Sequence, residues 1–380
     1  MATRRQWHLS AISAIVGAAL LAACGGGDSG PSITRVVSFG DSLSDLGTYT
    51  IATSQVPGVA PYFGGRFTTN THTGYTATTS PLSNTATIWV EWVAGRVGVP
   101  ITQAMLGFAT TRIPCPAAAN AALASSCTAY GQGGSRVTNP IGWKNEQGAL
   151  TDPLVTQVAA HLARFSKFND SDIVFAWTGG NDFLVQSRDL GLGQITPTTA
   201  VANMAAAGTE LANLIKNQIV ANGATRVAAM TLPDPGGTPD YSARTPQEKA
   251  FLTQMTNAYN SALLAGLAGT NVQIIDVAAW FVDVVARPTA YGLANTTATA
   301  CDPTKMSPAA AGSALFCNTA PAAQLTAAGL PTTISALRTG ANVNTWFWSD
   351  GVHPSIGGHK ALGDFVIGKL KEFGWLAVAQ

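Results

Sequence analysis

Short apolar runs, each ending in a turn, alternate with longer helical segments along most of this chain, and this alternation limits the folds open to it. Each run is rich in β-branched and apolar residues without strict polar alternation, which is typical of strands buried on both faces of a sheet. The runs occupy residues 33–39, 172–177, 226–232 and 272–275. Helices are expected at residues 88–97, 153–168, 200–220, 246–267 and 355–373. The alternation predicts an α/β fold in which helices cover both faces of a parallel sheet.

Three longer stretches do not follow this pattern. Residues 50–84 are rich in Thr, Gly and Pro, whereas residues 100–139 and 287–344 are irregular and contain two cysteines each. We therefore expect loop insertions near 64–87, 100–130 and 287–344. Because α/β sheets bind ligands beyond the carboxyl ends of their strands, these insertions are expected to form a rim or lid over a site there.

The composition suits one large domain that is not directed to nucleic acid. Of the 380 residues, 46% are apolar and 11% are charged, which is ample for a single hydrophobic core. The net charge is +1, so the bulk charge does not indicate a nucleic-acid partner or an acidic surface as a target.

The N-terminus has the pattern of an export signal. Arg4 and Arg5 precede a short apolar run at 9–19, which is too short for a membrane-spanning helix. The tetrapeptide that ends at Cys24 resembles a bacterial lipobox, in which the cysteine becomes the lipidated first residue of the mature protein.

These features predict a lipoprotein signal peptide at 1–23, a flexible tether at 24–32 and a folded domain at 33–380. The expected location is the bacterial cell envelope, with Cys24 anchored in the outer membrane. Ordinary cleavage after Ala22 or Ala23 is the alternative, and it would leave a free Cys24 and a periplasmic or secreted protein.

The remaining four cysteines form an even set, which in an exported chain predicts two disulfides. Three pairings are possible. We expect the two local pairs, Cys115–Cys127 and Cys301–Cys317, because each brackets one Pro-, Ala- and Asn-rich loop. The chain has no C-x-x-C motif, and no histidine lies near these cysteines, so they do not indicate a metal site.

A serine follows the first predicted strand directly. Residues 39–45 read Phe-Gly-Asp-Ser-Leu-Ser-Asp, which places Ser42 in a glycine-containing turn at the edge of the sheet. The alternative interpretation is a turn whose Asp and Ser cap the next segment. The motif differs from the G-x-S-x-G turn of ordinary lipases.

Two further motifs could supply hydrogen-bond donors to a developing negative charge. Residues 131–135 form a glycine cluster, and glycine allows a backbone N–H to approach a ligand closely. Residues 179–182, Gly-Gly-Asn-Asp, follow another predicted strand and offer the amide of Asn181. Each motif alone is also compatible with an ordinary turn.

The last motif, Asp350-Gly351-Val352-His353-Pro354, lies just before the closing helix. A neutral imidazole can accept a proton near neutral pH, and a carboxylate three residues ahead can hold its tautomer. A capped helix start is the alternative. Of the other histidines, His359 lies inside the predicted closing helix and is expected to be structural or at the surface.

Together the four motifs resemble those of the GDSL, or SGNH, hydrolase family, whose Ser, Gly, Asn and His come from four blocks in this order. The resemblance spans residues 36–365. It implies a flavodoxin-like, three-layer α/β/α fold with a parallel sheet, and a serine hydrolase that needs no cofactor or metal. The stretches 65–70 and 88–91 look like two halves of one family segment, separated here by a Thr-rich insertion.

The resemblance assigns a role to each block. Ser42 would be the nucleophile, His353 the general base and then acid, and Asp350 the residue that orients His353. The oxyanion donors would be the N–H groups of Ser42 and Gly134 and the side-chain amide of Asn181. Gly134 is preferred to Gly133 because it occupies the second glycine of the family block, although Ala129 replaces the asparagine that usually opens that block.

The expected activity is cleavage of carboxylic esters through an acyl-enzyme, acting on lipids or other acyl esters. Two alternatives remain. An acyltransferase would use the same acyl-enzyme, and a non-catalytic surface lipoprotein on this fold would bind lipid or glycan. Phosphoryl transfer at Asp41 or Asp45 is a weaker idea, because no Mg²⁺ or phosphate motif accompanies these residues.

Overall fold

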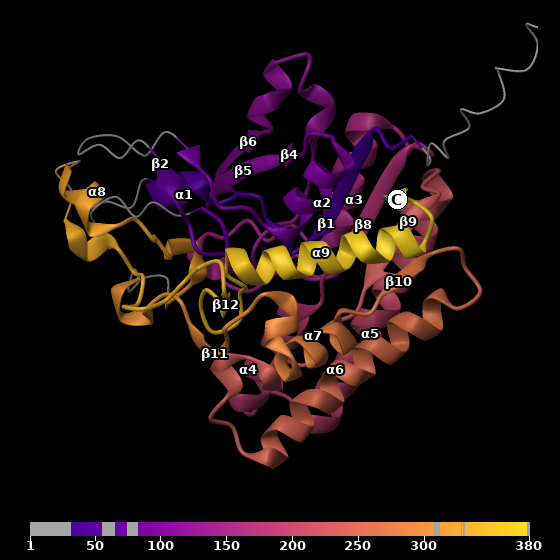
Figure 1. The fold of residues 1–380 in the computed structure, drawn as a ribbon. Coiled ribbons are helices and arrows are strands. Elements are labelled where there is room, and N and C mark those ends of the chain that lie inside the picture. The colour runs from indigo at the N-terminus through magenta and orange to yellow at the C-terminus, as the bar shows by residue number, and fades with distance from the viewer. Residues whose placement is uncertain are drawn as a thin grey trace, which may run out of the picture.

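The computed structural model of the chain describes residues 32–54, 65–73, 83–306, 312–327, 329 and 331–377 (Figure 1). The predicted signal peptide, Cys24 and all of the tether except residue 32 lie outside the described residues. Within the described part of the chain, no helix is both long enough and apolar enough to cross a membrane.

A six-stranded parallel sheet forms the centre of the domain, in the order β10-β9-β8-β1-β7-β4. Its strands are β1 (Arg35–Gly40), β4 (Thr102–Gln103), β7 (Cys127–Ala129), β8 (Asp172–Trp177), β9 (Arg226–Met230) and β10 (Gln273–Ile275). Every residue of β1 and β8 is buried, as continuous apolar strands should be. The prediction of a parallel α/β sheet is confirmed.

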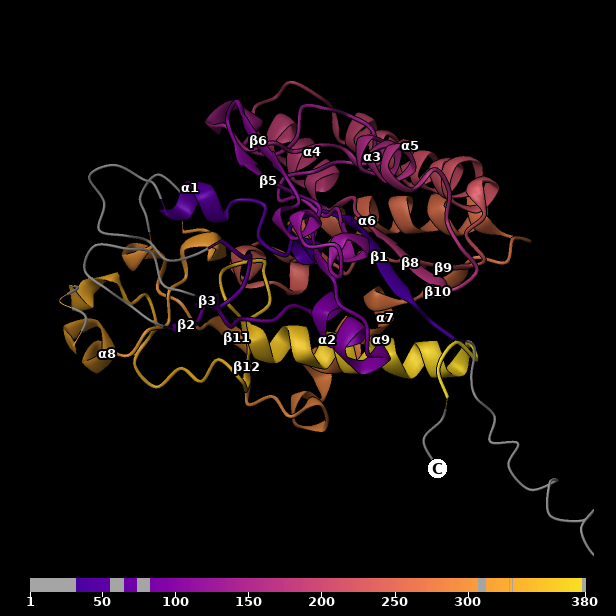
Figure 2. The same ribbon diagram turned by 90° about the horizontal axis from the view of Figure 1, so that it is seen from above.

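Helices cover both faces of this sheet, which gives the three layers visible in Figure 2. One layer contains α3 (Leu154–Phe165), α4 (Gly180–Gly191), α5 (Pro197–Leu214) and α6 (Pro246–Leu267). The other contains α2 (Trp89–Val97), α7 (Val277–Ala286) and α9 (Ile356–Glu372). Phe39 of β1 packs on His161 of α3, whereas Phe175 of β8 packs on Trp89 of α2, so neighbouring strands direct large rings to opposite layers.

The region 100–139, predicted to be irregular, contains two strands of the central sheet. β4 and β7 are two and three residues long and include no apolar run, so their sequence carries no strand pattern. The same region contains an antiparallel hairpin of β5 (Met105–Phe108) and β6 (Thr111–Pro114). The expectation of an irregular segment is therefore wrong here.

Smaller elements gather at one end of the sheet, as Figure 1 shows. They are α1 (Thr50–Ser54), β2 (His72–Thr73), β3 (Ser83–Asn84), β11 (Asn295–Thr299), α8 (Ala322–Ala327) and β12 (Trp346–Trp348). Of the two disulfides, Cys115–Cys127 joins the end of the β5–β6 hairpin to β7 of the central sheet, and Cys301–Cys317 joins the segment after β11 to the segment before α8. Both have the local pairing that the sequence predicts.

Candidate functional site

The turn after β1 places Ser42 at the carboxyl edge of the sheet. β1 ends at Gly40, where a Cβ atom would lie only 2.5 Å from the carbonyl oxygen of Trp177 in the adjacent strand. Asp41 then caps a short 3-10 turn, Ser42–Ser44, and its carboxylate accepts the N–H of Leu43 at 3.1 Å. The capping interpretation therefore holds for Asp41, and the same turn leaves the Ser42 side chain free to meet another residue.

That residue is His353, which comes from the segment between β12 and α9. Its Nε2 lies 2.9 Å from Ser42 Oγ, although 311 residues separate the two in sequence. On the other side of the ring, Nδ1 lies 2.8 Å from Asp350 Oδ2 and 3.0 Å from Oδ1. The three side chains thus form a continuous hydrogen-bonded chain from carboxylate to imidazole to hydroxyl.

Asp350 is held as an ionised carboxylate. Burial alone would raise its pKa, but the charge and hydrogen bond of His353 and two backbone N–H groups outweigh it, so the pKa lies below its ordinary value. Those N–H groups belong to Val352, at 2.9 Å, and His353, at 2.7 Å. The N–H of Ala314, from the loop closed by the second disulfide, donates to Oδ2.

The same interaction favours the protonated form of His353. Burial alone would lower the imidazole pKa, but the Asp350 carboxylate raises it by its charge and its hydrogen bond, with smaller contributions from Asp41 and Asp240. The net pKa of His353 lies above the ordinary value. An imidazole in this position can take a proton from Ser42 and keep it as a stabilised imidazolium.

The other histidines with described side chains do not take part. His161 and His359 are fully buried, and burial lowers the pKa of each to about 3. His161 stacks on Phe168 with ring centroids 4.3 Å apart. His359 is a buried residue of α9. Its burial agrees with the expected structural role and excludes the expected surface position.

The three candidate oxyanion donors, Ser42, Gly134 and Asn181, all border one cavity. The N–H of Gly133 donates to Asp45 Oδ2 at 2.8 Å, so it is already occupied. The N–H of Gly134, a residue with φ of +88°, has no hydrogen-bond acceptor among the described residues, and the same is true of the N–H of Ser42. Asn181 is buried and donates one amide hydrogen to the carbonyl of Ser135 at 2.9 Å. This occupancy favours Gly134 over Gly133 as a donor to substrate.

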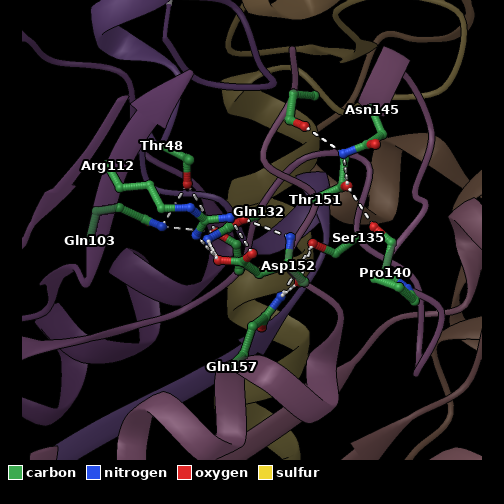
Figure 3. A network of polar contacts seen from close by, with 12 residues as sticks. Thr48, Gln103, Arg112, Gln132, Ser135, Pro140, Asn145, Thr151, Asp152 and Gln157 are labelled. Carbon is green, nitrogen blue, oxygen red and sulfur yellow. Dashed lines mark hydrogen bonds and ion pairs between the residues drawn. The ribbon is translucent and has the colours of Figure 1, made fainter. Parts of the chain in front are cut away.

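A polar network, drawn in Figure 3, braces the glycine loop 131–135 and the end of β1. Gln157 of α3 accepts the N–H of Gly40 at 2.9 Å and donates to its carbonyl at 2.8 Å. Gln157 also donates a hydrogen bond to the carbonyl of Asp152. The Asp152 carboxylate forms an ion pair with Arg112 and accepts a hydrogen bond from the side-chain amide of Gln132. The sequence does not indicate a role for Gln157, Asp152 or Arg112, because no motif distinguishes a helical glutamine or an isolated ion pair.

The cavity beside Ser42 has a volume of about 990 Å³ and is lined mostly by apolar side chains. Phe108 and Thr111 of the β5–β6 hairpin form part of its wall. Met306, Leu315 and Phe316, close to the second disulfide, form another part. Parts of the regions 100–130 and 287–344 thus border the site. Among the described residues, no cluster of three or more His, Cys, Asp or Glu could hold a metal ion.

Comparison with known proteins identifies the family. Residues 36–366 match the family model described as GDSL-like lipase/acylhydrolase. Over 276 residues, the chain is 27% identical to a phosphatidylcholine-sterol acyltransferase of Aeromonas hydrophila. That alignment covers 71% of this chain and 66% of the relative, so the chain spans slightly less than two thirds of the relative's length. Because the family model covers nearly all of the domain, the chain belongs to the GDSL-like lipase/acylhydrolase family.

Proposed function

We propose that this protein is a serine-dependent enzyme that cleaves carboxylic esters through an acyl-enzyme on Ser42. The observation that carries the proposal is the aligned contact of His353 with both Ser42 Oγ, at 2.9 Å, and the Asp350 carboxylate, at 2.8 Å. A serine hydroxyl is a weak nucleophile, and an adjacent base with its own orienting carboxylate is what activates it.

In the acylation step, Ser42 Oγ forms a bond to the carbonyl carbon of the ester. The proton of Ser42 moves to His353 Nε2, and the electron pair of the carbonyl π bond moves onto the carbonyl oxygen. When this tetrahedral intermediate collapses, the bond from carbon to the leaving oxygen breaks, and His353 returns its proton to the departing alcohol.

Negative charge on the former carbonyl oxygen is stabilised by the N–H groups of Ser42 and Gly134 and by the amide of Asn181. These donors are fixed before the reaction begins, so they need little reorganisation as charge develops. Asp41 lies close to this charge, and burial raises its pKa to about 7. A carboxyl group that is partly protonated near neutral pH adds less opposing charge than an ionised one would.

Deacylation decides between hydrolysis and transfer, because water or a second alcohol can attack the acyl-enzyme with His353 again acting as base. Two observations support transfer as a second candidate activity. The relative described above is named as an acyltransferase. The disulfide-bearing insertions line a large apolar cavity beside Ser42, and a site from which bound lipid displaces water would favour transfer.

We further propose lipid-like acyl esters as the substrate class, because a cavity of about 990 Å³ with apolar walls suits a long acyl chain. The test measures turnover of p-nitrophenyl esters from acetyl to palmitoyl, of acetylated glycans, and of phospholipid with and without an added long-chain alcohol. Rising kcat/KM with chain length is expected, and ester formation on the added alcohol would establish transfer. A preference for acetyl esters or acetylated glycans would refute the lipid assignment.

Asn181→Ala is expected to lower kcat by roughly 10²- to 10³-fold with a much smaller change in KM, because the amide acts on charge that exists only in the transition state. Steady-state kinetics with the preferred ester measures both constants. Asn203→Ala is the matched control, because it also removes a side-chain amide that donates one hydrogen bond, to Gln186, but it does not line the cavity. Equal losses of rate and thermal stability in Asn181→Ala would indicate a structural role instead.

We also propose that the enzyme is exported and anchored through a lipidated Cys24. Two disulfides support an oxidising compartment, since they form and persist there. Mass spectrometry of the mature N-terminal peptide tests the anchor. A diacylglyceryl-modified Cys24 is expected, and a free thiol or a start beyond residue 24 would exclude it.

A further inference from the structure

The peptide unit between Gly133 and Gly134 supplies one proposed oxyanion donor, so its orientation matters for catalysis. In a trans peptide, the carbonyl of one residue and the N–H of the next point in opposite directions. Whatever holds the Gly133 carbonyl therefore also sets the direction of the Gly134 N–H. The Gly133 carbonyl accepts a hydrogen bond of 2.7 Å from the hydroxyl of Tyr49.

The two glycines cannot fix this orientation by themselves, because glycine has the widest conformational freedom of any residue. Larger residues do not fit in their place. A Cβ atom on Gly133 would lie 2.2 Å from the ring of Phe67, and one on Gly134 would lie 2.3 Å from the carbonyl oxygen of Trp143. The N–H of Ser135 closes the turn on the Gln132 carbonyl at 3.1 Å, but this bond does not engage the Gly133 carbonyl, so the direction of that carbonyl depends on a contact from outside the loop.

Asp45 and Tyr49 hold this loop on two sides. Asp45 accepts the N–H of Gly133, and its other oxygen accepts the N–H groups of Gly47 at 2.8 Å and Thr48 at 2.7 Å. This contact fixes where the loop lies. It does not engage the Gly133 carbonyl, and the only side-chain hydrogen bond to that carbonyl among the described residues is that of Tyr49.

Tyr49 is itself held in a single position. Its side chain is 2% exposed, and its ring packs edge-on against Phe67 with centroids 6.1 Å apart. The N–H of Thr151 points at the Tyr49 oxygen from 3.5 Å, which leaves the hydroxyl hydrogen for Gly133. Burial, with a smaller contribution from the Asp45 charge, raises the pKa of Tyr49, so the hydroxyl stays a donor throughout the working pH range.

We propose that Tyr49 is a positioning residue for ester cleavage: by holding the Gly133 carbonyl, its hydroxyl aims the Gly134 N–H at the oxyanion formed beside Ser42. This inference rests on the proposed function, since it concerns the same reaction. Tyr49 acts through the peptide and does not itself donate to the substrate.

The test is Tyr49→Phe, which keeps the ring on Phe67 and removes only the hydroxyl. We expect kcat to fall by about 10- to 100-fold with little change in KM, because a misdirected donor weakens the transition state more than the bound substrate. A boronic acid that forms a tetrahedral adduct with Ser42 should lose affinity in proportion to kcat/KM. An ether analogue of the substrate, which forms no adduct, should bind as it does to the unmodified enzyme.

Tyr130→Phe is the matched control. Tyr130 is also buried, but it lies outside the cavity, and its hydroxyl has no hydrogen-bond partner among the described residues. It should keep full activity and full boronate affinity. The same result for Tyr49→Phe would overturn the inference, as would equal weakening of the ether analogue and the boronate.

The proposed function fails by a different result. If the unmodified protein neither turns over any acyl ester nor reacts at Ser42 with a fluorophosphonate, the proposed chemistry is wrong, whatever Tyr49→Phe does. If the unmodified protein passes both tests and Tyr49→Phe behaves like Tyr130→Phe, only the positioning role is lost.

Discussion

Ser42→Ala is expected to lower ester turnover by roughly 10⁴- to 10⁶-fold, because it removes the only atom that bonds to the acyl group. The fold should not change. Ser42 Oγ makes one side-chain hydrogen bond in the described structure, to His353, and the turn is held by Asp41 instead. Circular dichroism and the thermal midpoint should therefore match those of the unmodified protein, and fluorophosphonate labelling should disappear.

Ser44→Ala is a sharp control for this result. Ser44 lies in the same short turn and is fully buried, and its hydroxyl has no partner within the described part of the structure. Loss of that hydroxyl should leave turnover and labelling intact. If Ser42→Ala kept a rate within about tenfold of the unmodified enzyme, an acyl-enzyme on Ser42 could not be the main route.

Long elements with strong patterns could be predicted from the sequence. The range 246–267 predicted for a helix coincides with α6, where Thr245 and Glu248 form a capping box around Pro246. The range 172–177 coincides with β8, because six buried residues in succession leave no alternative to a central strand.

Short elements and elements with conflicting patterns could not be predicted. β4 and β7 are strands only because β1 offers a free edge for β7, and β7 in turn offers one for β4. The start of α4 is a Gly-Gly-Asn-Asp sequence that favours a turn, so this helix was missed. The sequence does not indicate α7 either, because it is apolar on nearly every side and the exposed Val282 and Val285 conceal the helical period of its buried face.

The candidate site follows the same division. Ser42, Asn181 and His353 stand in short motifs at the ends of strands or before a helix, so local sequence was enough to select them. Tyr49 contacts the glycine loop at 2.7 Å and Gln157 contacts the end of β1 at 2.9 Å, each more than 80 residues away in sequence. Nothing in the sequence around either residue indicates these contacts. Residues that support a site from a distance become visible only when the chain is folded.

Asp350→Asn is expected to lower kcat by roughly 10⁴-fold, because asparagine has nearly the same shape but carries no charge and replaces one acceptor oxygen by an NH2 group. His353 would lose both the partner that fixes its tautomer and the charge that stabilises the imidazolium. Since Asp350 is the largest contributor that raises the His353 pKa, and burial lowers it, that pKa should fall in the variant.

The pH profile separates this explanation from simple misfolding. The base must be neutral to accept the serine proton, so kcat/KM falls as pH drops through the His353 pKa. In the unmodified enzyme, the midpoint of this acid limb should lie above pH 6.5, the ordinary histidine pKa. In Asp350→Asn the midpoint should move to lower pH, and the maximum value of kcat/KM should be much lower. Asp41 and Asp240 also raise the His353 pKa, so they should limit this fall in pKa.

Asp364→Asn supplies the control, because Asp364 is an exposed carboxylate of α9 that pairs with Lys360 and lies outside the cavity. It should change neither the plateau nor the acid limb. If Asp350→Asn lost activity but left the acid limb in place, a group other than His353 would control the titration. The hydrogen-bonded chain from Asp350 to Ser42 would then be a structural contact, and the catalytic base would have to be sought elsewhere along the cavity wall.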